Sequence, residues 1–128
     1  LELLSSEPKT ASFHPIESQC YRSISPYIAL NQEKYEVYST LSETEKRKII
    51  EKGLVNHILT CAKWCGPTLL HTIEVNLIQM TQGNPMKIKD DLYFTPFDIM
   101  FECNTDIPDY IGIGKFVSRG YGTVVKYG

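Results

Sequence analysis

The chain has 128 residues, a length that suits one domain with a real core. Hydrophobic residues make up 42% and charged residues 22% of the sequence, which excludes an intrinsically disordered protein. The net charge of −2 gives no overall basic character, so a polyanionic ligand would have to bind a local cluster of cations. We find no signal peptide or long apolar run and expect a cytoplasmic protein that is not inserted in a membrane.

The first third of the chain predicts a strand followed by a connector. Residues 1–19 are polar with two prolines, and we expect a lead-in or an extra strand there. Residues 21–31 predict the first strand, with Pro26 placing it at a sheet edge or a bulge. Residues 31–41 predict a connector with a helical turn. Because residue 1 is Leu rather than Met, we expect a piece of a longer protein.

The main helix is predicted over residues 42–65. Ser42 and Glu45 fit a capping box, in which each residue satisfies a backbone N–H of the other. Apolar residues then recur at helical spacing and form one stripe: Ile50, Leu54, Ile58, Cys61, Ala62 and Cys65. We expect the lysines beside this stripe to face solvent, Trp64 to anchor the core, and Gly66-Pro67 to end the helix.

Strands return after the helix. Alternating apolar residues predict strands over 71–77 and 97–103, and a further strand over 86–94 with a break at Asp90-Asp91. Residues 124–127 close the sheet. This order predicts an α+β fold of the ferredoxin-like β-α-β-β-α-β type, with its second helix shortened or replaced by a loop. We expect one antiparallel sheet with the main helix on one face and the other face open to a partner.

A glycine-rich loop before the last strand carries the main binding prediction. It contains two G-x-G pairs, Gly112 with Gly114 and Gly120 with Gly122. Polar and aromatic residues complete the candidate site: Lys115, Ser118, Arg119 and Tyr121. Beyond Asp109 every charged residue is a cation, and these are Lys115, Arg119 and Lys126. Glycine amides flanked by cations predict a cradle for phosphates that does not read bases.

The spacing of this loop excludes two common phosphate-binding motifs. A dinucleotide fingerprint has glycine where this chain has Val117, and a Walker A loop ends in Gly-Lys-Ser/Thr rather than Gly120-Tyr121-Gly122. Two interpretations remain open. The loop either cradles a polynucleotide, or it forms a turn packed against the domain's own helix, with Lys115 and Arg119 solvated. For Tyr121, packing is favoured over stacking on a base.

The histidines and cysteines give weaker signals. His57 lies at the edge of the helical stripe and is either a half-buried boundary residue, which is the commoner case, or a candidate general base, whereas we expect His14 in a loop and His71 at the rim of the core. The four cysteines lack metal-ligand spacing and are expected to be small core residues: Cys20, Cys61, Cys65 and Cys103. We therefore predict no metal and no cofactor.

The order of elements and the glycine loop together resemble the RAMP superfamily of CRISPR proteins. Within it, the chain is similar to the C-terminal domain of CRISPR repeat-processing endoribonucleases. The resemblance is carried by residues 108–115 and 118–124, and by residues 25–31 with Tyr35 and Tyr38, and covers the chain from Cys20 to its end. Residues 20–128 would then form one RAMP domain, the C-terminal half of a two-domain protein.

The resemblance implies a role in antiviral defence. It implies binding of CRISPR repeat RNA and metal-independent cleavage, in which a 2′-hydroxyl attacks the adjacent phosphate. The catalytic histidine would lie in an N-terminal ferredoxin-like domain, which is one expected partner; a second copy of the chain is another. Two alternatives stay open: a non-catalytic structural subunit of a ribonucleoprotein, and a ferredoxin-like module that binds protein through its sheet.

Overall fold

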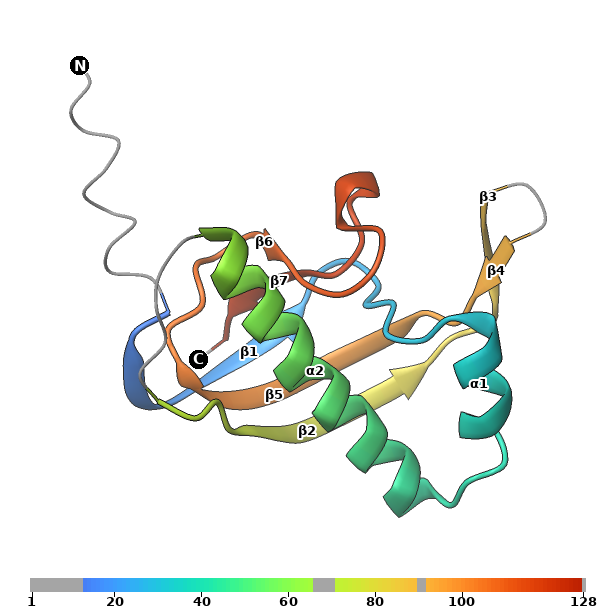
Figure 1. Ribbon diagram of the computed structural model, residues 1–128, viewed down its shortest axis with the longest axis horizontal. Helices are drawn as coiled ribbons and strands as arrows, with labels where there is room; N and C mark the ends of the chain where they lie inside the picture. The colour runs from blue at the N-terminus through green and yellow to red at the C-terminus, as the bar shows by residue number, and fades with distance from the viewer. Residues whose placement is uncertain (1–12, 66–70, 90–91, 128) are drawn as a thin grey trace.

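The fold is a five-stranded antiparallel sheet with one long helix across it (Figure 1). The computed structural model describes residues 13–65, 71–89 and 92–127. The strands lie in the order β2-β5-β1-β7-β6, and each pairs with its neighbours in antiparallel sense. Their bounds are Val75–Gln82 for β2, Phe97–Thr105 for β5, Pro15–Ser23 for β1, Thr123–Lys126 for β7 and Ile111–Gly112 for β6.

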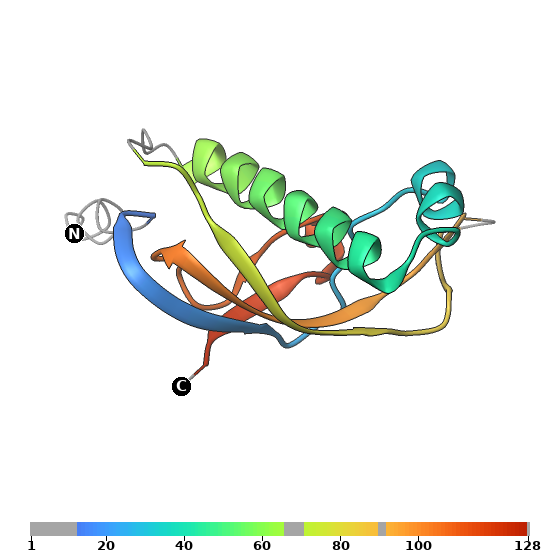
Figure 2. The same cartoon turned by 90° about the horizontal axis from the view of Figure 1, so that it is seen from below.

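The long helix α2 (Glu43–Cys65) covers one face of the sheet, as Figure 2 shows from the side. The capping box is present: the Glu45 N–H donates to the Ser42 hydroxyl at 3.3 Å, and the Glu45 carboxylate accepts from the Ser42 N–H at 3.2 Å. The buried residues of the helical stripe are Ile50, Leu54, Ile58 and Ala62. They pack over alternate residues of β5, and each large apolar side chain contributes about 1.5–3 kcal/mol by burial. None of the described helices is long and apolar enough to cross a lipid bilayer.

The predicted ferredoxin-like plan is confirmed. The four principal strands run in the order β2-β5-β1-β7. The two central strands, β5 and β1, are neighbours, and they are the third and the first of these four strands along the chain. Between β5 and β7, where a second helix would lie, the chain has only β6 and the short 3-10 turn η3 (Val117–Arg119). The structure therefore agrees with the predicted α+β class and with the prediction that a loop replaces the second helix.

The first strand is placed differently from the prediction. Strand β1 starts at Pro15, inside the expected lead-in, and ends at Ser23, so residues 24–31 are not part of it. Pro26 has no N–H to offer a sheet, and beyond it only Tyr27 pairs, through an isolated bridge to Phe97. A short helix α1 (Gln32–Tyr38) follows, with the Asn31 side chain accepting the Lys34 N–H, which confirms the helical turn expected there.

Two later strand predictions also change. Strand β2 begins at Val75, four residues after the predicted start, and continues to Gln82. Segment 86–94 is a separate two-stranded hairpin made of β3 (Met86–Lys89) and β4 (Leu92–Phe94), and the predicted break at 90–91 lies outside the described residues, as does Gly66-Pro67. The hairpin projects from the five-stranded sheet (Figure 1).

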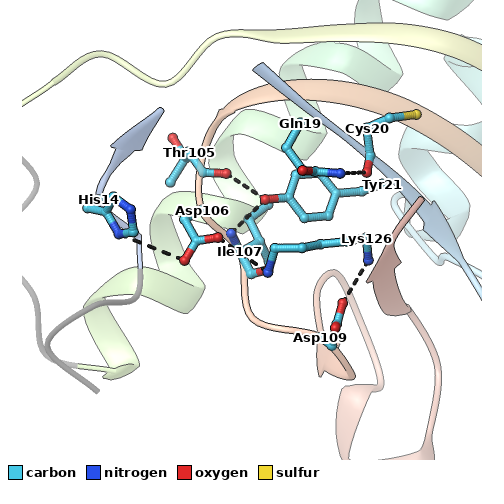
Figure 3. A network of polar contacts seen from close by, with 9 residues as sticks. All are labelled: His14, Gln19, Cys20, Tyr21, Thr105, Asp106, Ile107, Asp109 and Lys126. Carbon is cyan, nitrogen blue, oxygen red and sulfur yellow. Dashed lines mark hydrogen bonds and ion pairs between the residues drawn. The ribbon is translucent and has the colours of Figure 1, made fainter. Parts of the chain in front are cut away.

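A polar network fixes the end of β5 against β1 and β7 (Figure 3). The buried Tyr21 hydroxyl donates to the Thr105 carbonyl and accepts from the Ile107 N–H, both at 2.8 Å. The Asp106 carboxylate lies 3.3 Å from the Lys126 ammonium and 3.8 Å from His14. Burial raises the pKa of Tyr21, so the hydroxyl keeps its proton. The network sets the starting point of the glycine loop and pairs Lys126, which therefore adds little positive charge to that loop.

Candidate nucleic-acid interface

The glycine loop between β6 and β7 lies on the body of the domain. Gly114, Gly120 and Gly122 have positive φ angles of 96°, 92° and 75°, a conformation that favours glycine. A β-carbon on Gly114 would lie 2.7 Å from the Tyr27 ring and 2.8 Å from the Ile28 carbonyl oxygen, and one on Gly122 would overlap the Ile113 carbonyl. These two glycines are needed because the loop backbone approaches other chain segments closely.

The amides of the loop are mostly used within the fold. The Lys115 N–H donates to the Ile28 carbonyl at 2.9 Å, and the Gly122 N–H donates to the Pro26 carbonyl at 2.7 Å. The Gly120 N–H donates to Val117 within the 3-10 turn. The predicted cradle of glycine amides is thus wrong for Gly120 and Gly122. The contribution of these two glycines is to shape the loop, because their amides are already bonded within the fold.

The side chains between the glycine pairs meet solvent. Ser118 and Arg119 are exposed on η3, which projects from the rest of the molecule, while Lys115 and Tyr121 are half-buried (Figure 1). The Lys115 ammonium forms no ion pair with the described residues. The loop therefore presents positive charge on a protruding turn that the backbone bonds hold in place.

His57 contacts this loop region through a buried tyrosine. The Tyr27 hydroxyl lies 2.7 Å from His57 Nδ1, and Tyr27 is fully buried. Burial raises the pKa of Tyr27, whereas burial and then the charges of Lys115 and Lys34 lower the pKa of His57. The hydroxyl keeps its proton and needs an acceptor, so we assign the unprotonated nitrogen to Nδ1 and the proton to Nε2. In this tautomer His57 presents a donor at Nε2, and its Nδ1 lone pair is used by Tyr27.

A pocket of about 300 Å³ separates α2 from the glycine loop. It is lined by His57, Thr60, Cys61, Trp64, Gly112, Ile113, Gly114 and Val117. Trp64 is 86% exposed, so the prediction of a core anchor is wrong. Two residues turn a helix by about 200°, and this places Trp64 on the side of α2 opposite the buried Ala62. The helical spacing itself could have revealed this exposure.

The loop also contacts the β3–β4 hairpin. The rings of Phe94 in β4 and Phe116 in the loop lie 4.7 Å apart with an edge-on arrangement. No sequence pattern indicated this pair, since 22 residues separate the two positions. The hairpin supports one side of the loop, and α2 forms the wall on the side of the pocket.

Of the other histidines and the four cysteines, all of which the structure describes, Cys61 lines this pocket and the rest do not. His71 Nε2 lies 2.8 Å from the Thr105 hydroxyl, and His14 lies beside Asp106 at the start of β1. Cys103 is buried as predicted, Cys20 and Cys61 are half-buried, and Cys65 is exposed. Across the part of the chain that the structure describes, no three potential ligands gather as they would around a metal ion.

Comparison with known proteins gives consistent matches. A family model described as the Cas6b C-terminal domain matches residues 16–127. A curated relative, the uncharacterized protein MJ0978 of Methanocaldococcus jannaschii, is 37% identical over 106 residues, which are 83% of this chain and 71% of the relative.

Two solved structures have the same fold. One, described as a crystal structure of Cas6b, has a TM-score of 0.81 and 34% identity, with 90% of this chain and 66% of that chain covered. The other, a crystal structure of the CRISPR RNA processing endoribonuclease Cas6b, has a TM-score of 0.81 and 33% identity, with 90% and 58% covered. The chain thus spans somewhat under two thirds of each solved relative.

Proposed function

The chain belongs to the Cas6b C-terminal domain family, and from this premise we propose that it binds CRISPR repeat RNA within an endoribonuclease that processes precursor CRISPR RNA. The family predicted from the glycine loop and the order of strands is therefore confirmed. The observation that carries the proposal is the protruding turn of the loop, which carries Arg119 and follows the half-buried Lys115, in the segment where the sequence resembles repeat-processing enzymes.

The loop is suited to hold an RNA backbone by its side chains. Arg119 can grip a phosphate with two parallel hydrogen bonds, and Lys115 supplies a point charge beside it. The backbone bonds to Pro26 and Ile28 hold the turn in one conformation, so little ordering entropy is lost on binding. Contacts of this kind give affinity without reading the sequence of the RNA.

The binding part of the proposal is tested by fluorescence anisotropy with labelled repeat RNA from the host's own CRISPR array. Lys115→Ala and Arg119→Ala should each weaken binding and reduce the slope of log K against log salt by about 0.7, the value for one phosphate contact on a single strand. Lys48→Ala removes the same charge from an exposed turn of α2 near its other end and is the matched control. Wild-type affinity and slope in both loop variants would refute the assignment.

For cleavage, we propose that the 2′-hydroxyl attacks the adjacent phosphorus without a metal ion. The new O2′–P bond forms as the P–O5′ bond breaks, the 2′-hydroxyl proton passes to a general base, the leaving 5′-oxygen takes up a proton from water, and a cation stabilises the charge that develops on the phosphoryl oxygens. Our proposal gives the role of this cation to Lys115. In the tautomer that we assign, Nδ1 of His57 is bonded to Tyr27, and we propose that the base comes from a further ferredoxin-like domain.

This division of labour is tested by cleavage assays. The chain alone should bind repeat RNA and leave it intact, and cutting should appear with the further domain and persist in a chelator. Cleavage by the chain alone that His57→Asn abolishes would show that the base lies here. RNA left uncut even with the further domain would favour the non-catalytic structural subunit.

A further inference from the structure

Trp64 is a large apolar side chain that the fold leaves in solvent instead of burying it. Its side chain is 86% exposed at the end of α2, and Val117 across the pocket is 44% exposed. Together they leave two apolar surfaces in water on opposite sides of one hollow. A single exposed apolar residue is ordinary, but an aromatic that borders a pocket indicates a contact with a ligand.

The wall of this pocket carries a hydrogen-bond donor. His57 lines the pocket, and its Nδ1 edge is taken by the buried Tyr27 hydroxyl. The Nε2 edge, which bears the proton, is left for whatever enters the hollow. Tyr27 is itself fixed between α2 and the loop, because Gly114 lies against its ring. The donor is therefore held in one orientation before any ligand binds.

We propose that the pocket between Trp64 and the glycine loop binds one unpaired nucleobase of the RNA, with the base stacked on the indole and an acceptor on its edge bonded to His57 Nε2. The inference rests on the proposed function, because it places the base next to the phosphates held by the loop. Proteins recognise single-stranded RNA by this combination of aromatic stacking and edge hydrogen bonds.

Size and charge favour a base over an apolar peptide. The volume of about 300 Å³ is at the lower limit of pockets that hold small ligands, which range over roughly 300–1,000 Å³. Lys115 directly follows Gly114, which lines the pocket, so a cation stands beside the hollow and can meet the phosphate of a bound nucleotide. A wholly apolar partner would leave the imidazole donor unpaired, which is unfavourable.

Trp64 is the sole tryptophan of the chain, so its intrinsic fluorescence reports directly on the pocket. Two probes are compared: single-stranded repeat RNA, and a ribose-phosphate oligomer of the same length that lacks bases. Repeat RNA should quench the fluorescence. The abasic oligomer should bind the loop by anisotropy, through phosphates alone, and leave the fluorescence unchanged.

Variants at the two walls separate stacking from hydrogen bonding. Trp64→Ala should weaken binding of repeat RNA about 5- to 150-fold and leave the abasic oligomer unaffected, and Trp64→Phe should retain most of the affinity. His57→Asn keeps an acceptor for Tyr27 but has no donor at the Nε2 position, so it should weaken repeat RNA about 2- to 10-fold. His57→Gln keeps a donor there and should bind more tightly than His57→Asn.

The outcomes distinguish this inference from the proposed function. Repeat RNA that binds with unchanged Trp64 fluorescence, and with wild-type affinity in Trp64→Ala, would overturn the base pocket while RNA binding stands; Trp64 would then face a protein partner. Equal quenching by the abasic oligomer would also overturn it. Failure of both probes to bind would refute the proposed function itself.

Discussion

Replacement of Gly114 by alanine tests whether the glycine loop depends on its contact with Tyr27. The φ angle of 96° is strained for a residue with a β-carbon, at a cost of about 1–2 kcal/mol. The added carbon would also lie 2.7 Å from the Tyr27 ring and 2.8 Å from the Ile28 carbonyl oxygen. Neither neighbour can move easily, because one is a fully buried ring and the other is backbone.

The magnitude follows from these contributions. Overpacking of a well-packed site costs about 1–3 kcal/mol, and loss of glycine's freedom in the unfolded chain returns about 0.4–1 kcal/mol. Gly114→Ala should therefore lower the free energy of unfolding by about 2–4 kcal/mol, a large share of the roughly 5–15 kcal/mol typical of a domain. Gly120→Ala is the matched control, because its φ angle is 92° but no atom lies within 4 Å of the added carbon. Its loss should be about 0.5–1.5 kcal/mol.

Urea unfolding monitored by circular dichroism measures both losses. The midpoint of Gly114→Ala should fall clearly below that of Gly120→Ala, and the slopes of the two transitions should agree. The loop should also loosen in Gly114→Ala, so its affinity for repeat RNA should drop, whereas Gly120→Ala should bind nearly as wild type. Equal losses of stability in the two variants would show that backbone strain alone acts and that the contact with Tyr27 contributes nothing.

Two further predictions concern titration and charge. Lowering the pH from about 7.5 to about 5 should destabilise the domain through His57, because burial and the charges of Lys115 and Lys34 lower its pKa below 6.5 and the unfolded chain takes up the proton first. Urea midpoints at the two pH values should differ less in His57→Asn; an unchanged difference would exclude His57 as the cause. Lys126→Met should cost about 0.5–1.5 kcal/mol in thermal unfolding, since it removes a partly exposed ammonium bound to Asp106, yet leave RNA affinity unchanged. A weakened affinity would mean that Lys126 contacts RNA.

The elements that the sequence predicted well are those with local causes. The capping box of Ser42 and Glu45 and the stripe from Ile50 to Ala62 both lie within α2, so their pattern is visible without the rest of the chain. Strand β1 is different: among its nine residues only Tyr21 is buried, and the rest alternate too weakly to indicate a strand. It is a strand because β5 and β7 pair with it from distant parts of the chain.

The candidate site also has features that the sequence shows locally and features that depend on distant parts of the chain. The glycines and cations of the loop could be found from their order, and so could the family that they resemble. The contact of Tyr27 with His57 joins residues 30 positions apart, and the hollow beside Trp64 exists only where α2 meets the loop. No pattern along the chain encodes such contacts, because they depend on how two elements pack.

By itself the sequence determined the class of fold, the long helix and the position of a cationic glycine loop, since these follow from short-range spacing and composition. The tertiary structure alone decided what the glycines are for. The Gly122 and Lys115 amides bond the carbonyls of Pro26 and Ile28, the missing side chain of Gly114 lets Tyr27 approach, and Trp64 is left in water. The physical reason is that hydrogen bonds and close contacts between distant segments determine which groups of the loop remain available to a ligand.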